Sequence, residues 1–315
     1  MTALNELRQL RQQRGGTTVK PVTNLRKSDG RAALVFLAPW FLGLFGITLI
    51  PLVASLVLAT TDYDLLTAPT FVGLDNFTAM LSDTRLHQSL KVTLLYVLTG
   101  VPLQLVVALG LAVLLNRGLR GMTFYRSVFY LPSLLGGSVA IAILWRQVFG
   151  QDGIFNAFLG WFGIEGMGWI SHPDTALWTI VLLHVWTFGS PMIIFLAGLR
   201  QVPEMYYEAA SLDGASRWRQ FRSVTLPLLS PIIFFNLVMQ VIIAFQAFTQ
   251  AYVVSNGSGG PSDSTLFYTL YLYQEGFSNL RMGYASAMAW VLVLIVLLLT
   301  AVNFWASKFW VFYED

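Results

Sequence analysis

The sequence has no cysteine and few charged residues. Without cysteine, disulfide scaffolds, thioether-linked haem, thiol catalysis and Cys-ligated metal sites are excluded. Lys, Arg, Asp and Glu make up 11% of the 315 residues, whereas hydrophobic types make up 56%. Ordinary soluble domains have roughly 45–50% apolar residues. The composition therefore raises the question of where so much apolar sequence is placed.

The few charged residues are unevenly distributed along the chain. Six runs contain no Lys, Arg, Asp or Glu, namely 32–61, 92–116, 127–145, 175–199, 223–262 and 282–307. A helix needs about 20 apolar residues to cross a bilayer, and every run reaches that length within a residue. The runs predict an all-α, polytopic helical bundle with six transmembrane helices, with spans near 33–60, 92–116, 125–148, 175–199, 229–254 and 284–307.

The basic residues predict the orientation of the bundle. If each run crosses once, 15 of the 19 Lys and Arg residues fall on the side of the two termini and four on the other side. Loops rich in Lys and Arg stay cytoplasmic, so both termini are expected inside. The transmembrane domain then covers 32–310. The basic tail 1–31 is either a short amphipathic helix on the inner leaflet, through Leu4, Leu7 and Leu10, or a disordered topology anchor.

The cytoplasmic loop 200–227 has the signals of two short helices. Pro203 suits the first turn of a helix, and Glu204 lies where the helix dipole favours an acid. Gly214 is a natural stop. Ser216 can cap a second short helix that ends before Pro227. The loop is predicted to form a helix–turn–helix that protrudes into the cytoplasm; a plain amphipathic connector is the simpler alternative.

This loop also resembles a known motif. It reads Glu208-Ala209-Ala210, three residues, Gly214, nine residues, Val224, one residue, and Leu226-Pro227. The pattern is similar to the EAA loop in permease subunits of binding-protein-dependent ABC importers. Val224 replaces the family's isoleucine, which keeps the side-chain shape.

The resemblance extends over most of the chain beyond residue 31. Segments 124–132 and 145–146 are similar to the third span of carbohydrate-importer permeases, and segments 259–261, 264–266 and 283–287 to the end of that family's sequence. The similarity is greatest to six-span maltose-type and glycerol-phosphate-type permeases, and it implies a type I ABC importer permease fold.

The resemblance implies the partners and the coupling residues. A second permease completes the pathway, two cytoplasmic ATPases each grip one loop, and an extracytoplasmic solute-binding protein delivers the solute. ATPase coupling would fall to Glu208, Ala209, Ala210, Gly214, Leu226 and Pro227. No lysine follows a glycine, so a P-loop is absent. We therefore expect no cofactor in this chain, with ATP and Mg²⁺ bound by the partner ATPases.

Span five carries amides that suggest a polar path. On an ideal helix, Asn236, Gln240, Gln246 and Gln250 fall within an arc of about 120°. Amides facing a wet cavity and amides bridging helices are both compatible with this pattern. The resemblance to maltose-type permeases adds further candidates for the substrate path, namely Phe245, Gln246 and Thr249 on span five and Gly189 and Met192 on span four.

Catalytic and metal sites are not predicted. His87 and His172 lie outside the spans, no HExxH occurs, and no carboxylate lies within a span. His184, alone in span four, is expected to be a hydrogen-bonded bundle residue.

The sequence thus predicts the permease of an ATP-driven importer of a sugar or oligosaccharide in a prokaryotic plasma (inner) membrane, with membrane lipid but no nucleic acid as a partner. The charge-free spans offer no fixed ion to a charged solute, and amides, hydroxyls and aromatic faces suit a neutral polyol. The alternatives are a glycerol-phosphate-type permease, a membrane-embedded enzyme using Asp62, Asp64 and Asp75, and a secondary transporter, although ion coupling usually leaves an intramembrane carboxylate.

Overall fold

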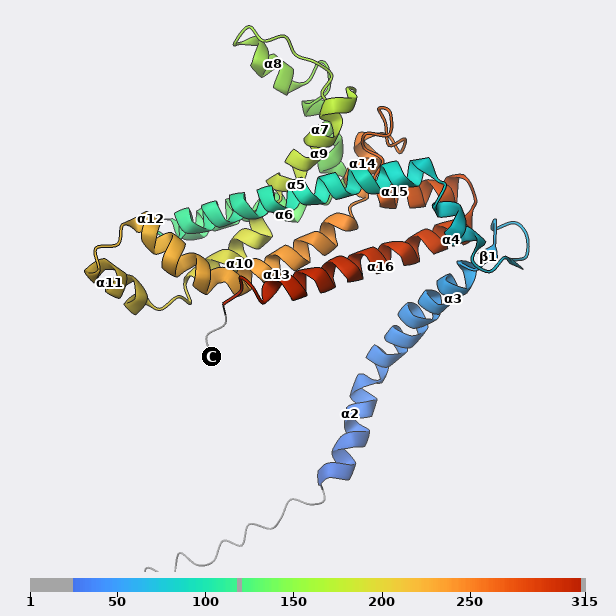
Figure 1. Ribbon diagram of the computed structural model, residues 1–315, viewed down its shortest axis with the longest axis horizontal. Coiled ribbons are helices and arrows are strands. Elements are labelled where there is room, and N and C mark those ends of the chain that lie inside the picture. The colour runs from blue at the N-terminus through green and yellow to red at the C-terminus, as the bar shows by residue number, and fades with distance from the viewer. Residues whose placement is uncertain (1–24, 118–120, 313–315) are drawn as a thin grey trace, which may run out of the picture. The chain divides into compact units, whose positions relative to one another are not determined.

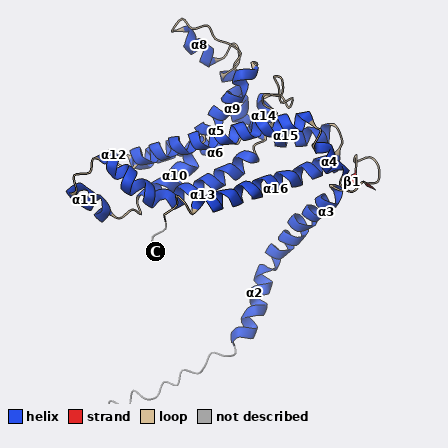
Figure 2. Cartoon of the chain, in the orientation of Figure 1, coloured by secondary structure: helices blue, strands red, loops and turns tan. Residues whose placement is uncertain are grey.

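The computed structural model describes residues 25–117 and 121–312, with side chains from residue 33 onward. It divides into two compact units, one up to residue 55 and one from residue 56. Helices form nearly all of the regular structure (Figures 1 and 2). The predicted amphipathic helix at Leu4–Leu10, and the tail as far as residue 24, lie outside the described residues. Residues 25–31 belong to the first helix.

The first unit is a single helical stretch with exposed apolar side chains. It comprises α2 (Leu25–Leu42), the π-helical segment η1 (Gly43–Leu49) and the start of α3 (Ile50–Leu58). The Ile50 amide donates to the carbonyl of Phe45, five residues earlier. This wider turn immediately precedes Pro51, which has no N–H and crowds the preceding turn. The helix therefore continues past Pro51.

The second unit opens with a two-stranded antiparallel sheet, β1 (Thr61–Asp62) and β2 (Thr70–Phe71), in which Thr61 pairs with Phe71. Its remaining elements follow in chain order: α4 (Asp75–Met80), α5 (Thr84–Leu115), α6 (Met122–Leu135), α7 (Val139–Val148), α8 (Ile154–Gly160), α9 (Pro173–Trp186), α10 (Gly189–Leu199), α11 (Glu204–Leu212), α12 (Arg217–Gln220), η2 (Phe221–Thr225), α13 (Leu226–Phe245), α14 (Thr249–Val254), α15 (Tyr268–Tyr273), η3 (Gln274–Ser278) and α16 (Met282–Ser307).

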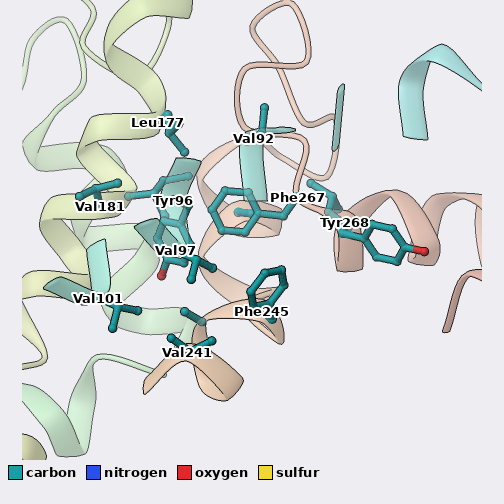
Figure 3. Close-up of a cluster of buried hydrophobic side chains, with 14 of the residues drawn as sticks. Val92, Tyr96, Val97, Val101, Leu177, Val181, Val241, Phe245, Phe267 and Tyr268 are labelled. Atoms are coloured by element: carbon teal, nitrogen blue, oxygen red, sulfur yellow. The ribbon is translucent and has the colours of Figure 1, made fainter. Parts of the chain in front are cut away.

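The long helix α5 is the centre of this unit. It packs against α9, α10, α13 and α15. Figure 3 shows the cluster where these elements meet, with Tyr96 and Val97 of α5 beside Val241 and Phe245 of α13. The rings of Tyr96 and Phe267 lie 4.6 Å apart between their centroids. Apolar burial along α5 thus fixes the neighbouring helices around one axis.

The first residues of α5 are tied to two later helices. Asp83 caps the helix by accepting a hydrogen bond from the Leu86 amide at 3.0 Å. Its other oxygen accepts from the hydroxyls of Tyr271 and Tyr284 at 2.8 and 2.7 Å. Although burial opposes the charged form, these hydrogen bonds hold the pKa of Asp83 below its usual range. The cap therefore joins α5, α15 and α16.

Several stretches are long and apolar enough to cross a membrane. Within the described residues, these are Ala33–Leu58, Thr84–Leu115, Arg217–Phe245 and Met282–Ser307. Two bent pairs, α6 with α7 and α9 with α10, are also long and apolar enough to cross a membrane when each pair is taken as one unit. The structure thus contains four candidate spans, or up to six if each bent pair is one span.

The third span differs from the single helix expected over 125–148. Helices α6 and α7 meet at a bend of 96°. Gly136 and Gly137 occupy the break, and Ser138 starts α7 by accepting a hydrogen bond from the Ile141 amide at 3.3 Å. Paired glycines followed by a capping serine favour a new helix start over continuation.

The fifth span differs from expectation at both ends. The helical stretch Arg217–Phe245 runs through Pro227, so the prediction that the loop's second helix ends before this proline is wrong. In η2, the Leu226 amide donates to the carbonyl of Phe221, and this widened turn accommodates the proline. The expected continuous helix over 229–254 is also wrong, because α13 ends at Phe245 and α14 begins at Thr249.

Candidate functional site

Three interrupted helical stretches, the predicted spans three, four and five, meet at one cavity. The interruptions lie between α6 and α7, between α9 and α10, and between α13 and α14. Gly136, Gly137, Thr187 and the segment 246–248 all line the same cavity of about 460 Å³. Non-helical backbone at membrane depth is tolerated only where protein buries it or where it lines a wet cavity. The cavity therefore accounts for how non-helical backbone is tolerated at these three interruptions.

Side chains from neighbouring elements bind the carbonyls released at two of the breaks. Gln250 Nε2 donates to the Gly136 carbonyl at 3.2 Å, which joins span five to the break in span three. Thr269 Oγ1 donates to the Ala247 carbonyl at 2.5 Å, which joins α15 to the break in span five. The break at 246–248 has no Gly or Pro, so this tertiary contact supplies the partner that the helical ladder would have provided.

The break in span four is held most extensively. Gln104 Nε2 donates to the carbonyls of His184 and Thr187 at 3.0 and 3.1 Å, and contacts Thr187 Oγ1 at 2.9 Å. Ser133 Oγ donates to the Thr187 carbonyl at 2.8 Å and accepts from the Ser190 amide at 2.9 Å. Spans two and three thus fix the 41° bend between α9 and α10.

The cavity wall is polar but uncharged. Its lining consists of Tyr96, Gln104, Ser133, Gly136, Gly137, His184, Thr187, Ser190, Gln240, Ile243, Ala244, Gln246, Ala247, Phe248, Thr249 and Gln250. Amides and hydroxyls provide hydrogen-bond donors and acceptors, while Tyr96 and Phe248 provide aromatic faces. Such a wall can bind a neutral, hydroxyl-rich molecule without a counter-ion.

The substrate-path candidates divide into two groups. Four of them line the cavity, namely Gln240, Gln246, Thr249 and Gln250. Phe245 and Met192 are instead buried in the apolar core. Gly189 lies where two helices approach closely, because a Cβ there would be 2.7 Å from the Phe129 carbonyl oxygen. The ideal-helix arc ends at Phe245, so the interruption, rather than helical periodicity, brings Gln246 and Gln250 to the cavity.

Sequence reasoning missed the contribution of span two to this wall, and on span four it named Gly189 and Met192 instead of the lining residues His184, Thr187 and Ser190. Gln104 is the only Gln in the charge-free run 92–116, whose other amide, Asn116, is its last residue, and an amide in the middle of a span is a signal that could have been used. His184 differs from expectation, since its Nε2 has no hydrogen-bond partner within the described residues. Its ring lies 5.2 Å from that of Tyr96, between centroids.

The predicted coupling loop, residues 200–227, contains a helix that ends at Leu212 and is followed by a turn at Gly214. Helix α11 contains Glu208, Ala209 and Ala210. The Gly214 amide donates to the carbonyl of Ser211 at 3.0 Å, and the Ala215 amide to that of Ala210 at 2.9 Å. These two bonds form a Schellman motif, whose left-handed position is Gly214 with φ +73°. The glycine is thus required by the backbone turn.

The second half of the loop leads directly into span five. Ser216 accepts a hydrogen bond from the Arg219 amide at 3.4 Å and so caps α12, as predicted. Leu226 and Pro227 begin α13. Tyr207 on α11 and Thr225 in η2 are hydrogen-bonded through their hydroxyls at 3.0 Å. Movement of α11 is therefore linked to the start of span five.

The coupling loop has an exposed apolar surface. Leu212 is 90% exposed and Trp218 is 70% exposed. Large exposed apolar side chains on a polar loop are typical of a protein-binding surface.

Comparisons with known proteins agree with this arrangement. The family model described as "Binding-protein-dependent transport system inner membrane component" matches residues 118–309. The probable ABC transporter permease protein YesP of Bacillus subtilis (strain 168) is 54% identical over 303 residues, covering 96% of this chain and 98% of that protein. The lactose transport system permease protein LacF of Rhizobium radiobacter is 33% identical over 280 residues, covering 87% and 93%.

The fold is also similar to that of a solved transporter. A chain in the crystal structure of a bacterial alginate ABC transporter, in complex with its alginate pentasaccharide-bound periplasmic protein, superposes with a TM-score of 0.75 at 20% identity, covering 90% of this chain and 97% of that chain. These findings confirm the resemblance seen in the EAA loop. The chain belongs to the inner membrane components of binding-protein-dependent transport systems, the permease subunits of ABC importers.

Proposed function

We propose that this permease imports a sugar or oligosaccharide through the cavity formed at its three interrupted spans. The observation that carries the proposal is the convergence of these breaks on one uncharged, polar cavity of about 460 Å³. In many secondary transporters, solute binds where discontinuous helices meet near the bilayer midplane, and the same geometry is present here. The similarity to the lactose permease LacF supports a saccharide as the solute.

The cavity wall supports a neutral solute. None of the described residues that line the cavity is Lys, Arg, Asp or Glu. An anion of the glycerol-phosphate type would have to be bound without a counter-charge from this chain, and an unpaired charge away from water is costly. A saccharide instead presents hydroxyls to the amides and a C–H face to Phe248.

The energy is proposed to come from partner subunits. Two ATPases would bind ATP and Mg²⁺ and contact the coupling loop at Glu208, Ala209, Ala210 and Gly214. Leu226 and Pro227 would pass the movement into span five. A second permease would complete the pathway, and a solute-binding protein would deliver the saccharide. Six spans with both termini in the cytoplasm would place the coupling loop beside the ATPases.

Single substitutions at Gln246 and Thr249 test the solute path. The side-chain amide of Gln246 makes no hydrogen bond to another described residue, so it is available to solute. Gln246→Ala and Thr249→Ala should each weaken the free energy of saccharide binding by about 0.5–1.5 kcal/mol, the net contribution of one hydrogen bond. In proteoliposomes of the complete transporter, saccharide uptake per folded complex should fall accordingly. Thermal stability should change little.

Asn236→Ala, on the preceding helix α13, is the matched control. The Asn236 side chain donates to the Ile232 carbonyl at 3.1 Å and does not line the cavity. This variant should alter stability and leave solute preference unchanged. If Gln246→Ala, like Asn236→Ala, leaves uptake per folded complex and solute preference unchanged, Gln246 does not contact the solute and the proposed solute path is wrong.

A further inference from the structure

A second polar cavity lies beside the coupling loop. This coupling-loop pocket has a volume of about 490 Å³ and is lined by Val113, Asn116, Arg117, Leu199, Tyr207, Arg217, Gln220, Phe221 and Thr225. The hydrogen bond between Tyr207 and Thr225 forms part of its wall. The pocket is separate from the cavity at the interrupted spans and shares no lining residue with it.

The pocket lies at the boundary of the membrane. Candidate span Thr84–Leu115 ends just before Asn116, the bent pair α9 and α10 ends at Leu199, and stretch Arg217–Phe245 begins at Arg217. All three ends contribute to the same pocket. Lipid headgroups occupy this depth of a bilayer, between the hydrocarbon core and the aqueous phase.

Among the residues that the structure describes, the pocket wall has two cations and no acid. Arg117 and Arg217 come from distant parts of the sequence, and both line the pocket with exposed side chains. Neither arginine forms a salt bridge to a carboxylate within 25–117 or 121–312. An anion in the pocket would face positive charge from both sides.

The helix dipole favours a cation at the position of only one of the two arginines. Arg117 follows the C-terminal end of α5, where a cation is favourable. Arg217 is the first residue of the stretch Arg217–Phe245, where the dipole disfavours a cation. An anion in the pocket would stabilise both side chains, and an arginine fork binds phosphate oxygens bidentately. Asn116, Tyr207 and Gln220 supply additional neutral hydrogen-bonding groups.

We propose that the coupling-loop pocket binds the phosphate headgroup of an anionic membrane phospholipid. Basic pockets between transmembrane helices at the membrane surface recognise such headgroups. The bound lipid would brace the loop helix α11 against the end of α5. The lipid would thus become part of the structure through which the coupling loop acts on the spans.

Lipid titration of the detergent-solubilised complete transporter tests this proposal. The probes are fluorescent phosphatidylglycerol, fluorescent phosphatidylcholine and inorganic phosphate as a competitor. Phosphatidylglycerol should bind saturably and more tightly than phosphatidylcholine. Arg117→Gln and Arg217→Gln should each weaken its binding about fivefold, and Arg117→Lys and Arg217→Lys should retain most of it.

Arg219→Gln and Arg222→Gln are the matched controls. Both arginines are exposed in the same loop and neither lines the pocket, so both variants should bind phosphatidylglycerol as the wild type does. Equal weakening in the controls would show diffuse attraction to a basic loop and overturn the proposal. Unchanged binding in the Arg117 and Arg217 variants would also overturn it. So would displacement of the lipid by inorganic phosphate at matched concentration, because the pocket would then prefer a free anion.

Discussion

The coupling loop and the cavity of this permease are built in opposite ways. In the loop, helix α11 ends in a Schellman motif and exposes its side chains, and the hydrogen bonds that close the motif and join Tyr207 to Thr225 lie within about 20 residues of sequence. In the cavity, the backbone is released from three helices and held by side chains that are distant in sequence, as Gln104 holds Thr187. Local bonds give the loop a fixed shape, whereas the cavity depends on the whole bundle. Substitutions in the loop and in the cavity should therefore affect different properties of the protein.

Glu208→Lys should have the largest effect. Glu208 is exposed on α11, so the substitution should leave the fold intact and place a cation where the family's loop presents a carboxylate. Reversing a charge in such an interface should weaken ATPase binding by about 2–5 kcal/mol. Co-purification of the ATPase measures this, with Glu204→Lys in the same helix as the control. Normal assembly and uptake in Glu208→Lys would contradict a coupling role.

Gln104→Leu should have the next largest effect, and it should act on the cavity alone. The change removes the donor that serves the carbonyls of His184 and Thr187. Buried carbonyls left without partners should destabilise the folded chain by about 1–3 kcal/mol, read as a lower melting temperature.

Asn303→Leu is the comparison for Gln104→Leu. Its amide donates to the Leu299 carbonyl one turn earlier in the same helix, so its loss should be small. Equal melting temperatures for the two variants would show that cross-helix bonds do not hold the break.

Gly214→Val should reduce the coupling of ATP hydrolysis to transport, and it should do so only by changing the backbone conformation of the turn. A Cβ at Gly214 would meet no atom within 4 Å, yet the residue has φ +73°. A β-branched side chain in the left-handed region costs about 1–2 kcal/mol. ATPase activity stimulated by the binding protein should fall, whereas Gly214→Asn should retain it because asparagine tolerates this conformation. Failure of both variants would indicate that the absence of a side chain, and not the turn, is required.

Lowering the pH should have the smallest effect, a loss of the stability contributed by Asp83. The pKa of Asp83 is lowered in the folded chain from its ordinary value of 3.8. Its contribution to stability is therefore complete above that ordinary value and is lost as the pH falls through the lower folded-state value. Asp83→Asn should be less stable than wild type at neutral pH, and the difference should shrink in acid. A difference that does not change with pH would show that the carboxylate charge is not involved.

Sequence reasoning succeeded where structure depends on neighbours along the chain. The stop at Gly214 and the cap at Ser216 were predicted because each needs only adjacent residues. The break at Gly136-Gly137 carried a local signal that was not used. The break at 246–248 has no local signal, because it depends on Thr269, more than 20 residues away. The role of Gln104 was missed for the same reason, since its partners Thr187 and His184 lie about 80 residues later.

The carbonyl–side-chain bonds at the breaks also affect how the chain is assembled in the membrane. The spans are synthesised in order, yet the Gly136 carbonyl in span three is bound by Gln250, and the Ala247 carbonyl in span five by Thr269. Until those later residues are in place, the earlier breaks need water or the insertion machinery as hydrogen-bond partners. Only the break in span four finds its partners, Gln104 and Ser133, already synthesised. The bend in span three can therefore become fully hydrogen-bonded only after span five has been inserted.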